Sequence, residues 1–237
     1  IVAISFGFLM AACNSDNEIP AGSEVIMITD EGSIFIELFD ETPIHKENFL
    51  NLVREGFFDG MAFHRVIEGF VVQGGDPRTI TSYPPSGSKE KQDAGYALPA
   101  EIIDTLAHIE GMLGAAREND DINPERKSSS SQFYFVTGEP YTIRQIDSVE
   151  ADRTGELLDE LYTDFEFARD SFGYAKGFVS FQDSINFKSF KYTSTQREIY
   201  STKGGAINLD NRYTLFGRIL KGIEVIRIKE VRVITQT

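Results

Sequence analysis

The sequence predicts a mostly-β domain, either a barrel or a sandwich, accompanied by two helices. Short runs of alternating apolar residues recur along the chain, and clusters of Gly, Pro and Asp separate them. Hydrophobic residues make up 41% of the 237 positions, which is enough for one sizeable core. We therefore expect one domain over residues 24–237, interrupted by a single insertion at about 139–206.

The predicted strands are short and bounded by turn-forming residues. The first two flank Asp30-Glu31-Gly32, which is a hairpin signal. Residues 77–95 carry prolines and many polar side chains, which indicates a loop. The predicted strands cover residues 25–29, 33–39, 61–67, 70–73, 111–116, 132–137, 214–220 and 231–235.

Two helices are expected beside these strands. Thr is a favoured N-cap residue and Pro is tolerated in a first turn, so Thr42 and Pro43 predict a helix that ends near Gly56. Residues 222–229 predict a second, short helix.

The insertion at 139–206 has a helical pattern of its own. Apolar residues recur at spacings of three and four, which predicts an amphipathic helix. They are Leu157, Leu161, Phe165, Ala168 and Phe172. Residues 195–200 predict a shorter helix before Gly204-Gly205. We favour a structural excursion packed on the domain over a partner-docking surface or a lid.

Charge and histidine content limit the possible ligands. The formal net charge is −14. Such an acidic chain is a poor partner for nucleic acid, whose binding relies on clustered Lys and Arg. The three histidines are too scattered for a metal centre, so we expect no cofactor or metal. His45 and His108 are expected on the surface, and His64 is expected to be structural rather than a base or a ligand.

The N-terminal residues resemble a bacterial lipoprotein signal. Residues 1–12 are uncharged and almost wholly apolar, yet too short to span a bilayer. They lead into Leu9-Met10-Ala11-Ala12-Cys13, which is similar to a lipobox. We expect a truncated signal peptide at 1–12, lipidation of Cys13 and a tether at 13–23. The alternative is a buried free cysteine in an N-terminal strand. The lipid would be the membrane contact and would place the protein in a bacterial cell envelope.

Residues 63–76 carry the strongest candidate site. Alternate residues of a strand share a face, so this segment can hold a guanidinium and an amide beside an apolar patch. Arg65 alone could be a surface cation, but Phe70 and Gln73 at their offsets favour a site. The segment offers no nucleophile, base or metal ligand set for other chemistry.

This segment closely resembles the signature of the cyclophilin family of peptidyl-prolyl cis-trans isomerases. Four motifs occur in the family's order: Phe63-His64-Arg65, Gln73-Gly74-Gly75-Asp76, Ser131-Gln132-Phe133 and Phe216-Gly217. The long insertion resembles that of bacterial lipoprotein members. The resemblance implies a closed eight-stranded antiparallel barrel capped by two helices, and rotation of Xaa-Pro bonds without a cofactor.

The resemblance also implies the site residues. Arg65, Phe70 and Gln73 match the catalytic positions, with Arg65 stabilising the twisted amide. The residues matching the proline pocket and peptide groove are Val71, Ala116, Arg117, Gln132, Tyr134, Leu209 and Tyr213. Four of them depart from the family's common residues, with Val71 in place of Met, Tyr134 of Phe, Tyr213 of His and Arg117 of Asn.

These expectations combine into two hypotheses from different classes. The first is a monomeric, lipid-anchored isomerase that acts on proline-containing exported polypeptides and aids their folding. The second is a catalytically weak module that binds proline-containing peptides, or a chaperone whose activity resides in the insertion. Loss of catalysis with retained peptide binding on changing Arg65 to Ala would favour the enzyme.

Overall fold

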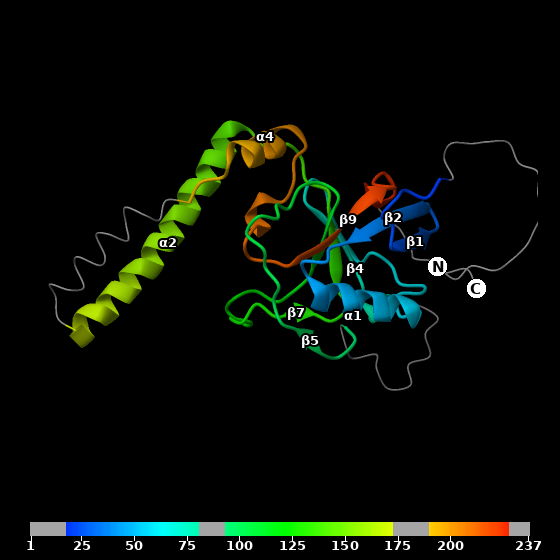
Figure 1. Ribbon diagram of the computed structural model, residues 1–237, viewed down its shortest axis with the longest axis horizontal. Coiled ribbons are helices and arrows are strands. Elements are labelled where there is room, and N and C mark those ends of the chain that lie inside the picture. Colours follow the sequence, from blue (N-terminus) through cyan, green and yellow to red (C-terminus); the bar gives the residue numbers. More distant parts are fainter. Residues whose placement is uncertain (1–17, 81–92, 173–189, 228–237) are drawn as a thin grey trace, which may run out of the picture.

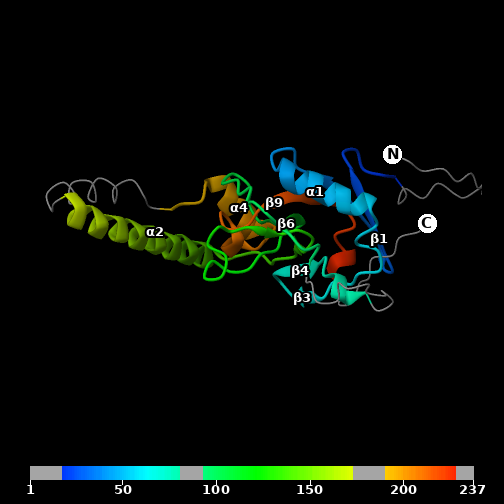
Figure 2. The same cartoon turned by 90° about the horizontal axis from the view of Figure 1, so that it is seen from below.

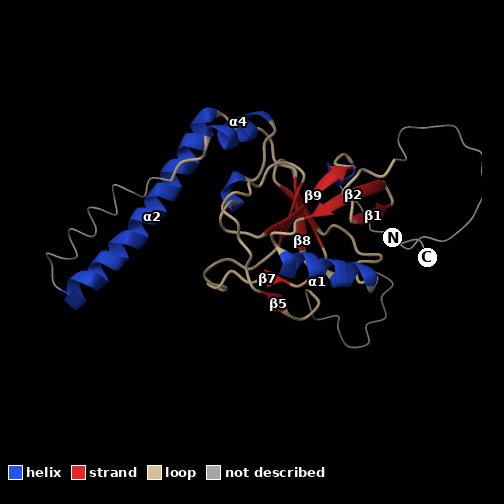
Figure 3. Ribbon diagram, viewed as in Figure 1, coloured by secondary structure: helices blue, strands red, loops and turns tan. Residues whose placement is uncertain are grey.

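The computed structural model describes residues 18–80, 93–172 and 190–227, with the backbone alone for 164–172 (Figure 1). They include a curled antiparallel sheet with helices beside it (Figure 3). The predicted signal peptide, Cys13 and the predicted strand 231–235 lie outside the described residues.

In the part of the chain that the structure describes, seven strands form the main sheet in the order β1-β2-β9-β6-β8-β4-β3, and every neighbouring pair is antiparallel. The strands are β1 (Val25–Thr29), β2 (Gly32–Leu38), β3 (Arg65–Ile67), β4 (Val71–Gly74), β6 (Met112–Ala115), β8 (Phe133–Val136) and β9 (Leu215–Lys221). Among the described residues β1 and β3 are the edges of the sheet. A closed eight-stranded barrel therefore stays a prediction. The predicted β1–β2 hairpin is confirmed.

A second sheet was not predicted from the sequence. It pairs β5 (Ala97–Leu98) with β7 (Ser128–Ser129). Strands of two residues are too short to show an alternating pattern, so periodicity cannot reveal them.

The main core lies on one face of the sheet, where aromatic rings from distant segments meet. Phe133 of β8 packs edge-on against Phe49 and Phe58, with ring centroids 5.6 Å apart in both pairs. Phe133 and Phe135 alternate in sequence with Tyr134 and Val136, which belong to a different apolar cluster. The period of two therefore separates the core from the opposite face, where the predicted site residues lie.

Helix α1 (Pro43–Arg54) begins where predicted, but its cap is different. Thr42 makes no capping hydrogen bond from its side chain. Glu101 instead accepts hydrogen bonds from the backbone N–H groups of Ile44 and His45, at 3.1 and 2.9 Å. The same carboxylate lies 2.6 Å from His45 Nδ1. His45 is buried by this contact, so its predicted surface position is wrong.

The insertion projects as an arm from one end of the domain (Figures 1 and 2). Within the described residues its helices are α2 (Ile143–Phe172) and α4 (Ser194–Thr202), which confirms both predicted helical segments. The insertion returns to its starting point, because a Cβ at Gly138 would lie only 1.7 Å from the Gly205 carbonyl oxygen. The long insertion therefore begins and ends at two backbone positions that lie next to each other. Within the described residues, no helix combines the length and apolarity needed to cross a membrane.

The base of the arm packs on the domain through a small core of its own. Its buried members are Ile146, Tyr192, Tyr200 and Ile207. Near the C-terminal end, the predicted helix 222–229 is a single 3-10 turn at Val225–Arg227 within the described residues.

Candidate active site

A row of directly opposed residues crosses four strands of the sheet. Arg65 of β3 is paired with Gln73 of β4, Gln73 with Tyr134 of β8, and Tyr134 with Gly114 of β6. Directly opposed residues point to the same face of a sheet. The strand register therefore brings the predicted guanidinium, amide and aromatic ring into one line on the face opposite the main core.

At Gly114 of this row a larger residue would not fit. A Cβ at Gly114 would lie 2.3 Å from Cζ of the Tyr134 ring. The tyrosine ring therefore lies flat across β6, in space that a side chain would otherwise occupy.

An apolar cluster beside the row unites the predicted proline-pocket residues. Its buried members include Val71, Ala116 and Tyr134, and Phe70, Leu209 and Tyr213 pack against them while remaining partly exposed. Rings of Tyr134 and Tyr213 meet edge-on at 6.2 Å between centroids. A surface of this kind can hold an apolar ring and exclude water from one side of it.

A short polar chain borders the apolar cluster. Arg65 Nη1 donates to Gln73 Oε1 at 3.2 Å, and Gln73 Nε2 donates to Gln132 Oε1 at 2.8 Å. Arg65 is exposed, so its remaining N–H groups face solvent or a ligand. The chain fixes the direction of the guanidinium while leaving most of its donors available.

His108 anchors the Tyr134 hydroxyl from below and is fully buried, which overturns its predicted surface position. Its Nδ1 lies 2.8 Å from Asp210 Oδ1, and its Nε2 lies 2.9 Å from the Tyr134 hydroxyl. Burial lowers the pKa of His108 against the opposing effect of Asp210, which favours the neutral ring. A carboxylate only accepts, so Nδ1 donates to Asp210 and Nε2 accepts from Tyr134.

The charged group of Arg117 does not lie open in the peptide groove. Its side chain is 3% exposed, and Nη1 lies 2.6 Å from Asp120 Oδ1. Its Nε donates to the Arg212 carbonyl at 2.9 Å, and its guanidinium lies 4.3 Å above the centre of the Tyr213 ring. The side chain therefore supports the pocket wall from behind, and its predicted contact with substrate stays a prediction.

Two hollows flank the site. One, of about 490 Å³, is lined by Arg65, Gln73, Ala116, Arg117 and Gln132 together with residues of the β5–β7 region. The other, of about 310 Å³, lies past Tyr213 and Leu209. With the apolar cluster between them, they form a track along which an extended peptide can lie.

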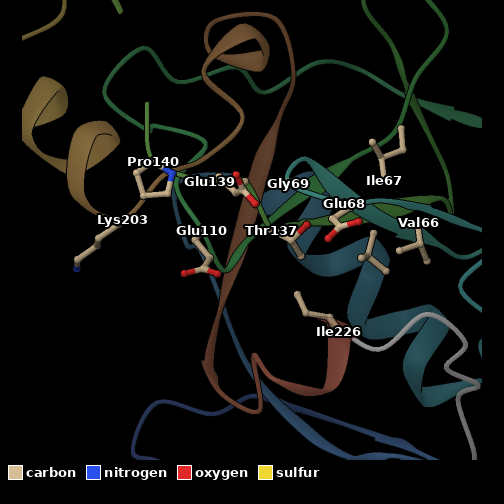
Figure 4. Close-up of a pocket in the computed structure, with 12 residues that line it drawn as sticks. Val66, Ile67, Glu68, Gly69, Glu110, Thr137, Glu139, Pro140, Lys203 and Ile226 are labelled. Carbon is tan, nitrogen blue, oxygen red and sulfur yellow. The ribbon is translucent and has the colours of Figure 1, made fainter. Parts of the chain in front are cut away.

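A larger cavity lies elsewhere in the described part of the chain. It has a volume of about 830 Å³, and Val66, Ile67, Glu110, Lys203 and Ile226 are among its lining residues (Figure 4). None of the predicted site residues lines it. Within the described residues, no group of three or more His, Cys, Asp or Glu side chains is placed to hold a metal ion.

Comparisons with known proteins identify the family. The family model described as cyclophilin type peptidyl-prolyl cis-trans isomerase/CLD matches residues 24–237. The chain belongs to the cyclophilin family. It is accordingly a peptidyl-prolyl cis-trans isomerase (EC 5.2.1.8).

Curated relatives carry the same activity in their names. A Synechococcus elongatus peptidyl-prolyl cis-trans isomerase is 36% identical over 119 residues, which cover 50% of this chain and 70% of the relative. A Staphylococcus epidermidis protein, provisionally named a peptidyl-prolyl cis-trans isomerase, is 28% identical over 208 residues, covering 87% of this chain and 78% of that protein. A solved Cryptosporidium parvum cyclophilin, crystallised in the presence of the dipeptide Ala-Pro, is 19% identical with a TM-score of 0.49, and the match covers 90% of this chain and 98% of that one.

The sequence prediction missed three residues that shape this cyclophilin's site. His108 and Asp210 hold Tyr134, and Gly114 makes room for its ring. His108 and Asp210 are 102 positions apart, so no local pattern could link them. The sequence did hold one signal for such a partner, namely Tyr134 at a position where the family commonly has Phe. A buried hydroxyl requires a hydrogen-bond partner.

Proposed function

We propose that Arg65 catalyses rotation about Xaa-Pro bonds by donating a hydrogen bond to the imide nitrogen of a twisted amide. The observation that carries this proposal is the row Arg65–Gln73–Tyr134, which places a fixed guanidinium beside an apolar pocket. Resonance between carbonyl and imide nitrogen gives the bond a barrier of about 18–20 kcal/mol. When the bond twists, the nitrogen regains its lone pair and becomes an acceptor that the planar amide lacks.

The pocket and the guanidinium have separate tasks in this mechanism. The apolar cluster holds the proline ring in the planar and twisted states of the amide alike. This contact strengthens binding of the peptide but does not accelerate the rotation. Arg65 interacts more strongly with the twisted state, which lowers the barrier. Gln73 orients the guanidinium through the 3.2 Å contact, so the donor needs little reorganisation during rotation.

The proposed setting is the cell envelope, where the enzyme aids the folding of exported polypeptides as a monomer. The support is the sequence alone, namely the apolar run before Cys13 and the polar residues after it. If a lipid on Cys13 anchors the protein, Cys13→Ala should move it from the membrane fraction to the supernatant. Retention of Cys13→Ala on membranes would contradict the anchor.

The closed barrel belongs to the same proposal. The edge strand β3 leaves Val66 38% exposed, and Ile226, near the start of the C-terminal segment, lines the cavity of Figure 4. Residues 231–235, Val-Arg-Val-Ile-Thr, are rich in β-branched side chains, as an eighth strand would be. Slow amide hydrogen exchange at 231–235 would support closure, and rapid exchange would contradict it.

Refolding of a substrate protein tests the proposed function. A protein whose slow refolding phase is limited by a prolyl bond should refold faster in the presence of the wild-type chain. Arg65→Ala should lose this acceleration, and Arg54→Ala, which changes an exposed arginine on α1, should keep it. Equal acceleration by all three proteins would rule out the arginine mechanism.

A further inference from the structure

The inserted arm contacts the body at the rear of the proline pocket. Two pocket residues depend on these contacts: Tyr134, whose hydroxyl is held by His108, and Leu209, which ends a 3-10 turn at Ile207–Leu209. Both are reached from the arm through Asp210, which follows this turn directly.

The first connection runs from helix α4. The Tyr200 hydroxyl donates to Asp210 Oδ2 at 2.5 Å, and Tyr200 is completely buried. The other carboxylate oxygen of Asp210 accepts from both the backbone N–H and Nδ1 of His108, at 2.7 and 2.8 Å. His108 then holds the Tyr134 hydroxyl. Four buried side chains therefore form one continuous hydrogen-bonded chain from the arm to the pocket floor.

The second connection runs from helix α2. Nη2 of Arg153 donates to the carbonyl oxygens of Ile207 and Asp210, at 2.8 Å each. These two carbonyls lie on either side of Leu209 in sequence. Arg153 is 7% exposed, and its guanidinium lies 4.8 Å over the ring of Phe190, on the return segment of the arm. The turn that carries a pocket wall is thus clamped by the arm.

We propose that the insertion is a working part of the active site, in which Tyr200 and Arg153 are positioning residues for Tyr134 and Leu209. This inference rests on the proposed assignment of the apolar cluster as the proline pocket. Neither residue touches substrate. Their effect is to keep one arrangement of the pocket populated, and binding weakens in proportion when that arrangement is populated only part of the time.

This role predicts a specific kinetic signature. The pocket holds the proline ring equally in the planar and twisted states, so a loosened pocket weakens binding without slowing rotation of bound peptide. Tyr200→Phe should raise the Kd for a short Xaa-Pro peptide about threefold to tenfold and leave the on-enzyme exchange rate within about twofold. Tyr162→Phe, at a 55% exposed position on α2, is the matched control and should change neither quantity.

A double-mutant cycle tests the connection itself. If Tyr200 acts through Asp210 and His108 on the Tyr134 hydroxyl, its effect on Kd should shrink in a Tyr134→Phe background, since the end of the chain is already cut. The ¹⁵N shifts of His108 should also move in Tyr200→Phe and stay unchanged in Tyr162→Phe. Additive Kd effects, or an unchanged His108 signal, would overturn the proposal.

The outcomes separate this inference from the function on which it rests. Wild-type protein that binds the peptide without accelerating exchange would contradict the proposed mechanism, and the Kd and ¹⁵N measurements would still decide the role of the arm. Should Tyr200→Phe fail to fold, Arg153→Lys provides the second variant, with a raised Kd expected. Unfolding of both would overturn the proposal, because the arm would then be needed for the fold rather than for the pocket.

Discussion

Gly114 and Tyr134 lie directly opposite each other on β6 and β8, and the tyrosine ring occupies the space in which a Cβ at Gly114 would stand. We expect Gly114→Ala to lower the free energy of unfolding by about 1–3 kcal/mol, the usual cost of overpacking. It should also weaken binding of an Xaa-Pro peptide, because the displaced ring is part of the pocket. Urea unfolding and peptide titration measure the two effects.

The control is Gly155→Ala on α2, where nothing lies within 4 Å of the added Cβ. Alanine is favoured over glycine inside a helix by about 0.5–1 kcal/mol, so this variant should be slightly more stable. A stable, normally binding Gly114→Ala protein would show that the ring does not need that space.

Buried His45 makes the stability depend on pH. Burial lowers the pKa of His45 below its ordinary value of 6.5, although Glu101 opposes the shift, and Nε2 has no hydrogen-bond partner among the described residues. Above pH 6.5 the residue is neutral in both states. As the pH falls below 6.5, the unfolded chain takes up the proton before the folded chain does, so stability falls until the folded pKa is reached.

Urea unfolding between pH 7.5 and 5 should show this loss, with a slope of up to about 1.4 kcal/mol per pH unit for this residue. His45→Gln removes one titrating group and should flatten the curve, leaving the slope from His108 and His64, whose pKa values burial also lowers. Parallel curves for the two proteins would contradict the assignment.

Arg117 should matter for stability as well as for the pocket. Arg117→Met leaves the Arg212 carbonyl without its donor and removes the cation above Tyr213, so we expect a loss of about 1–3 kcal/mol. Arg126→Met is the matched control, because Arg126 pairs with the same Asp120 from a 37% exposed position. An exposed pair of this kind is worth about 0–1 kcal/mol. Equal losses in thermal or urea unfolding would show that the burial of Arg117 is immaterial.

The outer and inner parts of the arm should differ in their tolerance of deletion. Removing 145–200 deletes Tyr192, Tyr200 and Ile146 from the small core, and full burial of one large apolar side chain is worth about 1.5–3 kcal/mol. That variant should be strongly destabilised. Removing only 158–187 keeps these contacts, and near the two cut points Phe190 N donates to Thr154 Oγ1 at 3.1 Å. Circular dichroism melting should show a normal transition for the shorter deletion, and equal melting of both would contradict the account.

The sequence predicted the parts of the fold that depend on local pattern. Alternation along 132–137 separates core phenylalanines from pocket residues, and the structure has that strand at Phe133–Val136. Pro43 marks the start of α1 because proline fits a first helical turn. The order of the family motifs indicated which residues should meet, and the register brings Arg65, Gln73 and Tyr134 into one row.

The failures concern partners that are distant in sequence. His45 and His108 were expected at the surface, yet each is buried with a carboxylate, Glu101 and Asp210 respectively. A polar residue is buried where the fold supplies a hydrogen-bond partner for it, and the position of that partner depends on how the whole chain folds. The cap of α1 follows the same rule, since Glu101 rather than Thr42 supplies it.

The role of Arg65 is the central claim, and exchange NMR on a short Xaa-Pro peptide tests it most directly. The measurement gives the Kd and the on-enzyme exchange rate for wild type, Arg65→Ala and the control Arg54→Ala. We predict that Arg65→Ala loses at least about a hundredfold in exchange rate, equivalent to about 2.7 kcal/mol of barrier, while Kd changes by less than about threefold. An Arg65→Ala protein that binds the peptide and exchanges it at the wild-type rate would contradict the account.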